Sequence, residues 1–251
     1  MKFIHLSDLH FHRNKNDNKE TTKMLQFIKT QYPDHYLIIT GDITDDGHEK
    51  QFACAMEALK GFKDRIFLCP GNHDFGAAGN FYSQERAERF DEMLSIPLGQ
   101  GGTFTRDNTP VVNIVSARGD NVMLIALDTN LETEHFFDFA CGEVGDKQLS
   151  ALDRILSNHP PANMIKFLFF HHHPFIHNNP FMELIDGRKL MRTIYGRVNM
   201  VLFGHKHESK LWKNYGNIPF VLAADNAPGK KFAREISVQK GEVTVNDLKI
   251  D

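Results

Sequence analysis

The residues from 2 to 69 alternate short apolar segments with longer amphipathic ones, and this order limits the folds that the chain can adopt. Short apolar segments predict strands, whereas longer segments with apolar residues at helical spacing predict helices. The expected elements are a strand at 2–6, a helix at 18–31, a strand at 36–40, a helix at 48–61 and a strand at 65–69. This order predicts parallel strands joined by right-handed crossovers.

The pattern changes after the glycine-rich segment "GQGG" at 99–102, which follows a helix expected at 83–94. Two apolar segments on either side of "RGD" predict an antiparallel hairpin. Further on we expect a helix at 145–157, a strand at 165–170, a helix at 182–195, a strand at 199–203, and strands in "SKLWKNY", "PFVLAA", "AREISVQK" and "EVTVNDLKI". Two sheets packed face to face with helices outside accommodate these elements, whereas one doubly wound sheet does not.

No repeat, low-complexity tract or linker divides the 251 residues, so we predict a single domain over 1–251. No apolar run is long enough to span a bilayer, and the start "MKFIHLSDLH" is not typical of a secretion signal, so we expect a cytoplasmic protein without a membrane partner. The net charge of -3 disfavours nucleic acid as a partner, although a local basic patch stays open. The three cysteines form no C-x-x-C, which argues against a disulfide framework or a thiolate zinc site.

Five of the expected strands end in polar side chains that can bind metal. The endings are "SDLH" at 7–10, "GD" at 41–42, "GNHD" at 71–74, "HHHP" at 171–174 and "GHKH" at 204–207. Ligands of open α/β sheets bind beyond the carboxyl ends of strands, so these endings can meet at one rim. Because extended side chains alternate faces, Asp8 and His10 can point into one pocket, as can His205 and His207.

The donors are oxygen and imidazole without thiolate, which suits Mn, Fe, Zn, Co or Ni. The candidate ligands are Asp8, His10, Asp42, Asn72, one of His171, His172 and His173, and finally His205 and His207. Seven donors are enough for two ions if one carboxylate bridges them. Asp42 is the expected bridge because it follows the central strand. An isolated H-x-H is more often only polar surface, so this prediction depends on the other segments.

The five motifs in this order resemble those of the calcineurin-like metallophosphoesterases, over about residues 2–207. The resemblance implies a four-layer αββα fold and a site with two divalent or trivalent transition-metal ions, Mn or Fe before Zn, Co or Ni. It assigns one ion to Asp8, His10, Asp42 and His207, and the other to Asp42, Asn72, His172 and His205. The family pattern H-x-P selects His172 over its two neighbours.

Two such ions can hold a bridging hydroxide that attacks phosphorus in line with the leaving oxygen. His73 is the candidate general acid or stabiliser of transition-state charge, and Asp74 is expected to orient its imidazole. For Asp128 we expect a structural or supporting hydrogen bond.

Polar residues in nearby loops receive weaker predictions. His12 and His177 either line the entrance to the site or lie in exposed loops. Asp45, Asp46 and His48 are expected in a solvated loop and helix cap. The segment "HFFDF" at 135–139 is expected in core or lid packing.

The opening motif, the spacing to "GNHD" and the "HHHP" variant look most like the class III cyclic-nucleotide phosphodiesterase branch. This resemblance favours hydrolysis of a phosphodiester, with a small 3',5'-cyclic nucleotide as a candidate substrate. A DNA-processing nuclease or a phosphomonoesterase of the same superfamily is the alternative. A non-catalytic scaffold is a remote one, since scaffold members are expected to lose ligands that this chain keeps.

Overall fold

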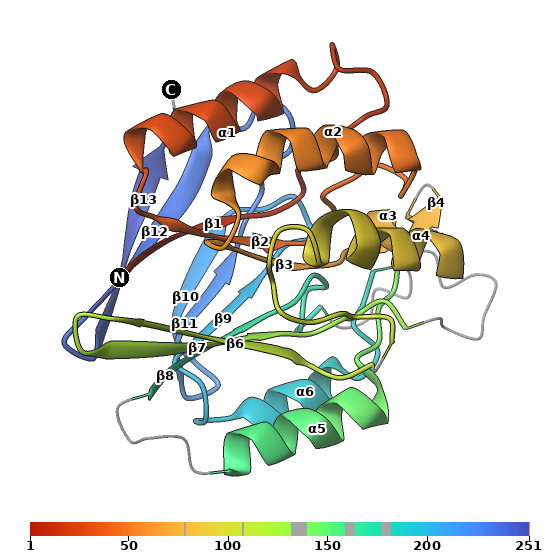
Figure 1. Ribbon diagram of the computed structural model, residues 1–251. Helices are drawn as coiled ribbons and strands as arrows, with labels where there is room; N and C mark the ends of the chain where they lie inside the picture. Colours follow the sequence, from red (N-terminus) through yellow and green to blue (C-terminus); the bar gives the residue numbers. More distant parts are fainter. Residues whose placement is uncertain (78, 107, 132–139, 159–163, 177–181, 251) are drawn as a thin grey trace.

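The computed structural model describes residues 1–77, 79–106, 108–131, 140–158, 164–176 and 182–250, and two large β-sheets dominate it (Figure 1). The first sheet has the order β13-β12-β1-β2-β3 and the second has the order β10-β11-β9-β8-β7-β6. Helices lie outside both sheets, so the predicted four-layer αββα fold is confirmed. None of the helices in these ranges is long and apolar enough to cross a membrane.

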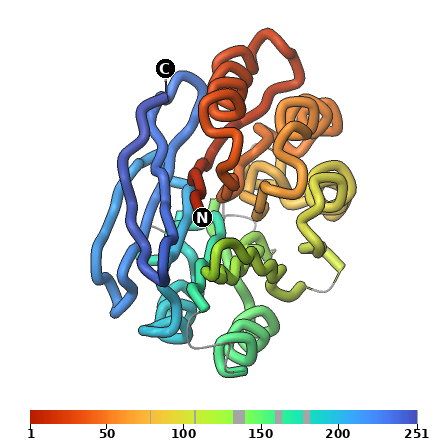
Figure 2. Tube along the Cα trace, turned by 60° about the vertical axis from the view of Figure 1, so that its left-hand side comes forward, coloured from red at the N-terminus to blue at the C-terminus, as the bar shows by residue number. Residues whose placement is uncertain are grey.

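The first sheet begins with the predicted parallel strands. Its members are β1 (Lys2–Leu6), β2 (Tyr36–Thr40), β3 (Ile66–Cys69), β12 (Phe232–Gln239) and β13 (Glu242–Lys249). β1 and β2 pair in parallel, with Phe3 opposite Tyr36, and β2 and β3 pair in parallel, with Leu37 opposite Ile66. The chain returns at its end to add β12 antiparallel to β1, so the C-terminal strands lie beside the N-terminal one (Figure 2).

The second sheet contains the predicted hairpin and the later strands. Its members are β6 (Val111–Ala117), β7 (Asp120–Ala126), β8 (Met164–Phe169), β9 (Met200–Phe203), β10 (Lys210–Tyr215) and β11 (Ile218–Ala223). β7, β8, β9 and β11 run parallel to one another, whereas β6 and β10 are antiparallel edge strands. The carboxyl ends of the parallel strands therefore lie at one edge of this sheet.

The helices differ from the predictions mainly at their ends. They are α1 (Lys19–Gln31), α2 (Glu49–Leu59), α3 (Asn72–Phe75), α4 (Gln84–Phe90), α5 (Gly145–Ser157) and α6 (Gly187–Ile194). The helix expected at 83–94 is divided, because α4 passes into a π-helical turn at Asp91–Ser95. The carboxylate of Asp91 accepts hydrogen bonds from the backbone N–H groups of Phe104 and Thr105, which ties this turn to the following loop. α6 is shorter than predicted, and neither α3 nor the hairpin of β4 (Gly76–Ala77) and β5 (Phe81–Tyr82) was expected.

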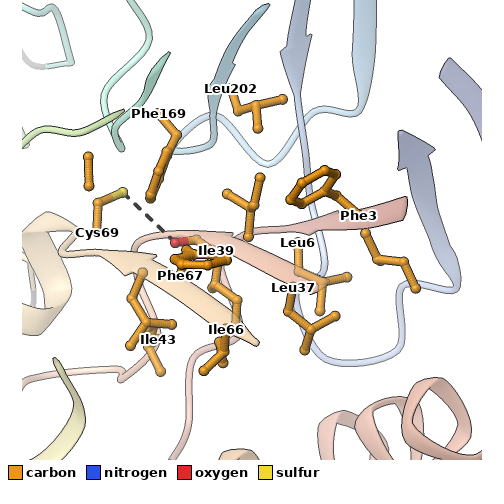
Figure 3. Close-up of a cluster of buried hydrophobic side chains, with 14 of the residues drawn as sticks. Phe3, Leu6, Leu37, Ile39, Ile43, Ile66, Phe67, Cys69, Phe169 and Leu202 are labelled. Carbon is orange, nitrogen blue, oxygen red and sulfur yellow. Dashed lines mark hydrogen bonds between the residues drawn. The ribbon is translucent and has the colours of Figure 1, made fainter. Parts of the chain in front are cut away.

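The main core lies between the two sheets. Side chains of Phe3, Phe169 and Leu202 are buried there, with the first from one sheet and the other two from the opposite sheet (Figure 3). The rings of Phe3 and Phe167 meet edge to face, with centroids 5.5 Å apart. A second apolar cluster, which includes Leu152 of α5, lies between the second sheet and its covering helices. Tight packing of this kind fixes the spacing of the two sheets, and with it the spacing of the loops at their ends.

Candidate metal centre

The predicted ligands follow strands of both sheets and meet at one rim of the molecule. In each of three groups of residues, the donor atoms lie within 4.8 Å of one another. The groups are Asp8 with His10 and His207, His10 with Asp42 and His73, and Asp8 with Asp42 and His171. The rings of His172 and His205 are also close, with centroids 4.5 Å apart. Asn72 follows Gly71, where a Cβ atom would overlap the Asp42 carboxylate. The expected convergence of the five strand ends is therefore what the structure shows.

Buried donor atoms without a hydrogen-bond partner mark the same place. Within the described part of the chain, these include Asp8 Oδ2, His10 Nε2, Asn72 Oδ1, His172 Nε2 and His205 Nε2. Buried polar atoms are normally hydrogen-bonded, because leaving one unpaired costs free energy. Of the thirteen such atoms in the described ranges, these five and His10 Nδ1 belong to predicted ligands, and carboxylate, amide and imidazole donors suit a transition metal. The residues present therefore fit a metal centre.

The three consecutive histidines differ in which ring nitrogens are engaged. Nδ1 of His172 lies 2.8 Å from the hydroxyl of Thr129, which leaves Nε2 without a partner. Such a contact is typical of a histidine whose other nitrogen binds metal. His171 belongs to one of the close donor groups, but its Nδ1 lies 2.8 Å from the Thr40 carbonyl and its Nε2 lies 3.2 Å from the Asp42 carboxylate. His173 points elsewhere, toward Glu208. These contacts distinguish His172 from its two neighbours, and its assignment as a metal ligand stays a prediction.

The pKa shifts in the centre also separate His171, which pairs with Asp42, from His172. Burial by itself would lower the pKa of His171, but the adjacent Asp42 carboxylate outweighs it and raises this pKa to about 9. Burial would raise the pKa of Asp42, yet the charge of His171 and its hydrogen bond hold it well below the usual value. Burial also lowers the pKa of His205 to about 3 and keeps the pKa of His172 well below its ordinary value. The lowered pKa of each ring favours the neutral imidazole, which is the form that binds metal.

Five predicted ligands have left-handed backbone angles, which are uncommon for residues other than glycine. Their φ values are 59° at Asp8, 44° at His10, 48° at Asp42, 76° at His205 and 50° at His207. Backbone hydrogen bonds support these conformations, since Asp8 N–H donates to the Gly41 carbonyl at 3.1 Å and His10 N–H donates to the Asp42 carbonyl at 3.0 Å. Strained backbone of this kind gathers at functional sites and persists where surrounding contacts enforce it.

His73 lies beside the candidate ligands, but Asp74 does not orient it. The ring nitrogen Nδ1 of His73 lies 2.7 Å from the backbone carbonyl of Asp45. The buried Asp74 carboxylate instead accepts hydrogen bonds from the backbone N–H groups of Gly71, Ile43 and Thr44. The prediction that Asp74 orients the His73 imidazole is therefore wrong, because three backbone N–H groups and the Thr44 hydroxyl donate to its carboxylate instead. Asp74 holds the two loops that carry Asp42 and Asn72 together.

One acidic residue near the centre, Asp225, was missed from the sequence, and another, Asp45, was predicted only as part of a solvated loop. Asp225 is buried, and its carboxylate lies 3.5 Å from Nδ1 of His207. It follows the apolar strand β11, so the rule that found the other strand ends could have found it. The Asp45 carboxylate lies 3.8 Å from Nδ1 of His10 and 3.4 Å from Nδ1 of His12. The expected solvated loop is thus part of the rim of the centre.

Three other residues named from the sequence, His48, Asp46 and Asp128, make contacts that support the local structure. His48 is the N-cap of α2, as expected, and Asp46 pairs with Arg13 on the surface. Asp128 accepts hydrogen bonds from the backbone and side chain of Asn130, which agrees with the structural contact expected for it. His177 and the segment 135–139 lie outside the described residues.

Comparisons with known proteins agree with this geometry. A sequence model of the calcineurin-like phosphoesterase family matches residues 1–209. A probable cyclic nucleotide phosphodiesterase of Coxiella burnetii is 26% identical over 220 residues, covering 82% of this chain and 76% of that protein. A probable glycerophosphodiester phosphodiesterase of Arcobacter nitrofigilis is 25% identical over 185 residues, which cover 70% of this chain and 58% of that protein. The crystal structure of a dimetal phosphatase from Danio rerio has a TM-score of 0.72 at 15% identity, covering 100% of this chain and 98% of that one, and this likeness shows the fold alone.

Proposed function

Because the chain belongs to the calcineurin-like phosphoesterase family, we propose that it hydrolyses a small phosphodiester, with 3',5'-cyclic nucleotides as the favoured substrates. The observation that carries the proposal is the group of five buried, unpartnered donor atoms on residues from both sheets.

Two transition-metal ions fit these donors. One ion would be held by Asp8, His10, Asp42 and His207, and the other by Asp42, Asn72, His172 and His205. When bound, the two ions supply an activated water as nucleophile and positive charge for the phosphoryl oxygens. Asp42 lies in close donor groups with both His10 and Asp8, which is compatible with its place as the shared ligand.

The protein itself contributes proton transfer through His73. With Nδ1–H donated to the Asp45 carbonyl, a proton on Nε2 makes the ring a cation. That cation lies beside Asn72 and can stabilise the charge on the leaving oxygen and then protonate it. The His73 backbone N–H also donates to the Asp42 carboxylate at 3.0 Å, so the ring and the shared ligand are held in one arrangement.

The names of the relatives support a diester rather than a monoester. The relatives from Coxiella burnetii and Arcobacter nitrofigilis both bear phosphodiesterase names, although they differ in the substrate named. The cyclic nucleotide is favoured because the first of these covers more of both chains. The overall charge of -3 makes a nucleic acid a poorer candidate than a small substrate.

A screen of Mn²⁺-supplemented protein tests the proposal. We expect faster turnover of bis-p-nitrophenyl phosphate than of p-nitrophenyl phosphate, and hydrolysis of cyclic nucleotides ahead of glycerophosphodiesters and DNA. An Asp42→Asn variant should lose both metal and activity, whereas His73→Ala should keep metal and lose turnover, most of all with poor leaving groups. Preference for the monoester, or cleavage of DNA alone, would contradict the proposed substrate class.

A further inference from the structure

Three of the four edges of the two large sheets carry a feature that prevents pairing with another strand. Edge strands present unpaired N–H and C=O groups, and soluble proteins protect them with charges or with a cover. The edges are β3 and β13 in the first sheet and β6 and β10 in the second. They can be compared with one another directly.

The first sheet is protected at both edges. At β3, the side-chain amide of Gln100 accepts a hydrogen bond from the Leu68 N–H and donates one to the Leu68 carbonyl at 2.6 Å, so it takes the place of a neighbouring strand. At β13, the exposed residues Glu242, Asp247 and Lys249 place charges along the edge.

The second sheet is protected at β10 only. Lys210 and Lys213 of β10 are exposed and charged. β6 is seven residues long and has no charged residue between Val111 and Ala117. Within the ranges that the structure describes, its backbone pairs with β7 and with no other segment.

The outer face of β6 is also apolar and exposed. Val112 is 37% exposed and Ile114 is 58% exposed, although both are large β-branched residues. They pair with Ile125 and Met123 of β7, which belong to the apolar cluster beneath α5 and α6. The apolar outer face of the second sheet therefore continues to Val112 and Ile114 on its edge strand β6; Figure 1 shows the strand beside β7. A long, uncharged, apolar edge of this kind is a site for strand pairing.

We propose that β6 pairs antiparallel with β6 of a second copy of this chain, so that the two six-stranded sheets join into one. A two-fold axis at Ile114 puts this residue opposite itself and Val112 opposite Ser116, all on the outer face. Two neutral strands do not repel each other, and one self-complementary patch covers both apolar surfaces, as symmetric dimers require. A charged partner strand would gain no ion pair at β6.

The pairing leaves the metal centre open. His172 follows β8, and β7 lies between β8 and β6. Neighbouring strands are about 4.8 Å apart, so this predicted ligand lies roughly 10 Å from the joined edge. Ile114 lies in the middle of β6, opposite Met123, and is more than half exposed, so its replacement should leave phosphoesterase turnover unchanged.

Sedimentation equilibrium over a range of protein concentrations tests the proposal. The wild-type protein should have the mass of two 28.7 kDa chains, and Ile114→Lys should reduce that mass twofold by placing two like charges on the axis. Thr244→Lys on β13 is the matched control, since it adds the same charge to an exposed position of a protected edge. It should keep the mass of the wild type. Circular dichroism checks that both variants fold.

Three results would overturn the proposal: a wild-type protein that stays a single chain at all concentrations, an Ile114→Lys variant with the mass of two chains, or equal loss of mass in Thr244→Lys. If Ile114→Lys does not fold, Ile114→Cys decides the question. Oxygen with a copper catalyst should oxidise its two thiols to a disulfide between copies, because opposite residues of paired strands bring their Cβ atoms close. Wild-type protein treated in the same way controls for the native cysteines, and no cross-linking beyond that control would overturn the pairing.

Discussion

Replacement of Thr129 by valine tests which of the three consecutive histidines holds a metal. The Thr129 hydroxyl lies 2.8 Å from Nδ1 of His172, and both residues are buried. Valine has nearly the volume of threonine and no hydroxyl, so the variant removes this contact with little change in packing. Without it, the proton of the neutral His172 ring is no longer directed to Nδ1, and Nε2 is less available for metal.

The expected loss of metal affinity is at the lower end of the range for such contacts. Removing a hydrogen-bonding neighbour of a metal-bound histidine weakens metal binding about 10- to 100-fold. Because the Ala140 backbone also interacts with the His172 ring and remains in the variant, we expect roughly tenfold weaker binding, or about 1.4 kcal/mol. The free energy of unfolding should fall by about 1 kcal/mol, as for loss of one hydrogen bond.

Calorimetric titration with Mn²⁺ measures the effect. We expect one of two sites to weaken in Thr129→Val and to recover in Thr129→Ser, which restores the hydroxyl. If both sites bind as in the wild type, while His171→Asn loses one ion, then His171 is the ligand and the assignment from the H-x-P pattern fails.

Three further changes have defined outcomes. Asp225→Asn should weaken Mn²⁺ binding about tenfold in the same titration, because the carboxylate beside His207 Nδ1 is lost; unchanged binding would deny Asp225 this role. Gly204→Ala should lower the free energy of unfolding by about 1–3 kcal/mol in urea, since a Cβ would overlap the Ser7 hydroxyl; an unchanged midpoint would refute the close approach. Burial, with the charge of Arg234, lowers the pKa of His5 to about 3, so stability present above pH 6.5 is lost as pH falls toward 3. Between pH 7 and pH 5 the metal-free wild type should lose about 2 kcal/mol more stability than His5→Gln, and equal losses in urea unfolding would contradict this.

The sequence predicted the elements whose apolar spacing is regular. β1, β2 and β3 and the two intervening helices lie where the pattern indicated, because each strand is a short apolar run between turns. The π-helical turn after α4 could not be predicted in this way, since its Asp91 carboxylate accepts hydrogen bonds from Phe104 and Thr105, thirteen and fourteen residues later in the chain. Helix ends set by distant contacts leave little signal in local spacing.

In the candidate site, too, positions set by the strand pattern could be predicted, whereas contacts with the backbone of other loops could not. Strand ends placed Asp8, Asp42 and His205 correctly at one rim, because that rule depends only on parallel strands. The partner of His73 could not be read in the same way. It is the backbone carbonyl of Asp45, and any residue type supplies a carbonyl, so side-chain chemistry pointed instead to the adjacent Asp74.

The origin of the donors on two separate layers makes the width of the centre a property of the core. Asp8 and Asp42 extend from one sheet, whereas His172 and His205 extend from the other, and the layers are held apart by rings such as those of Phe3 and Phe167. The thickness of the apolar core thus sets the distance between the predicted ligands of the two sheets. A smaller side chain in the core between the sheets is expected to shorten the distance between the ligands of the two sheets. The preferred ion radius would then change, although every ligand residue is kept.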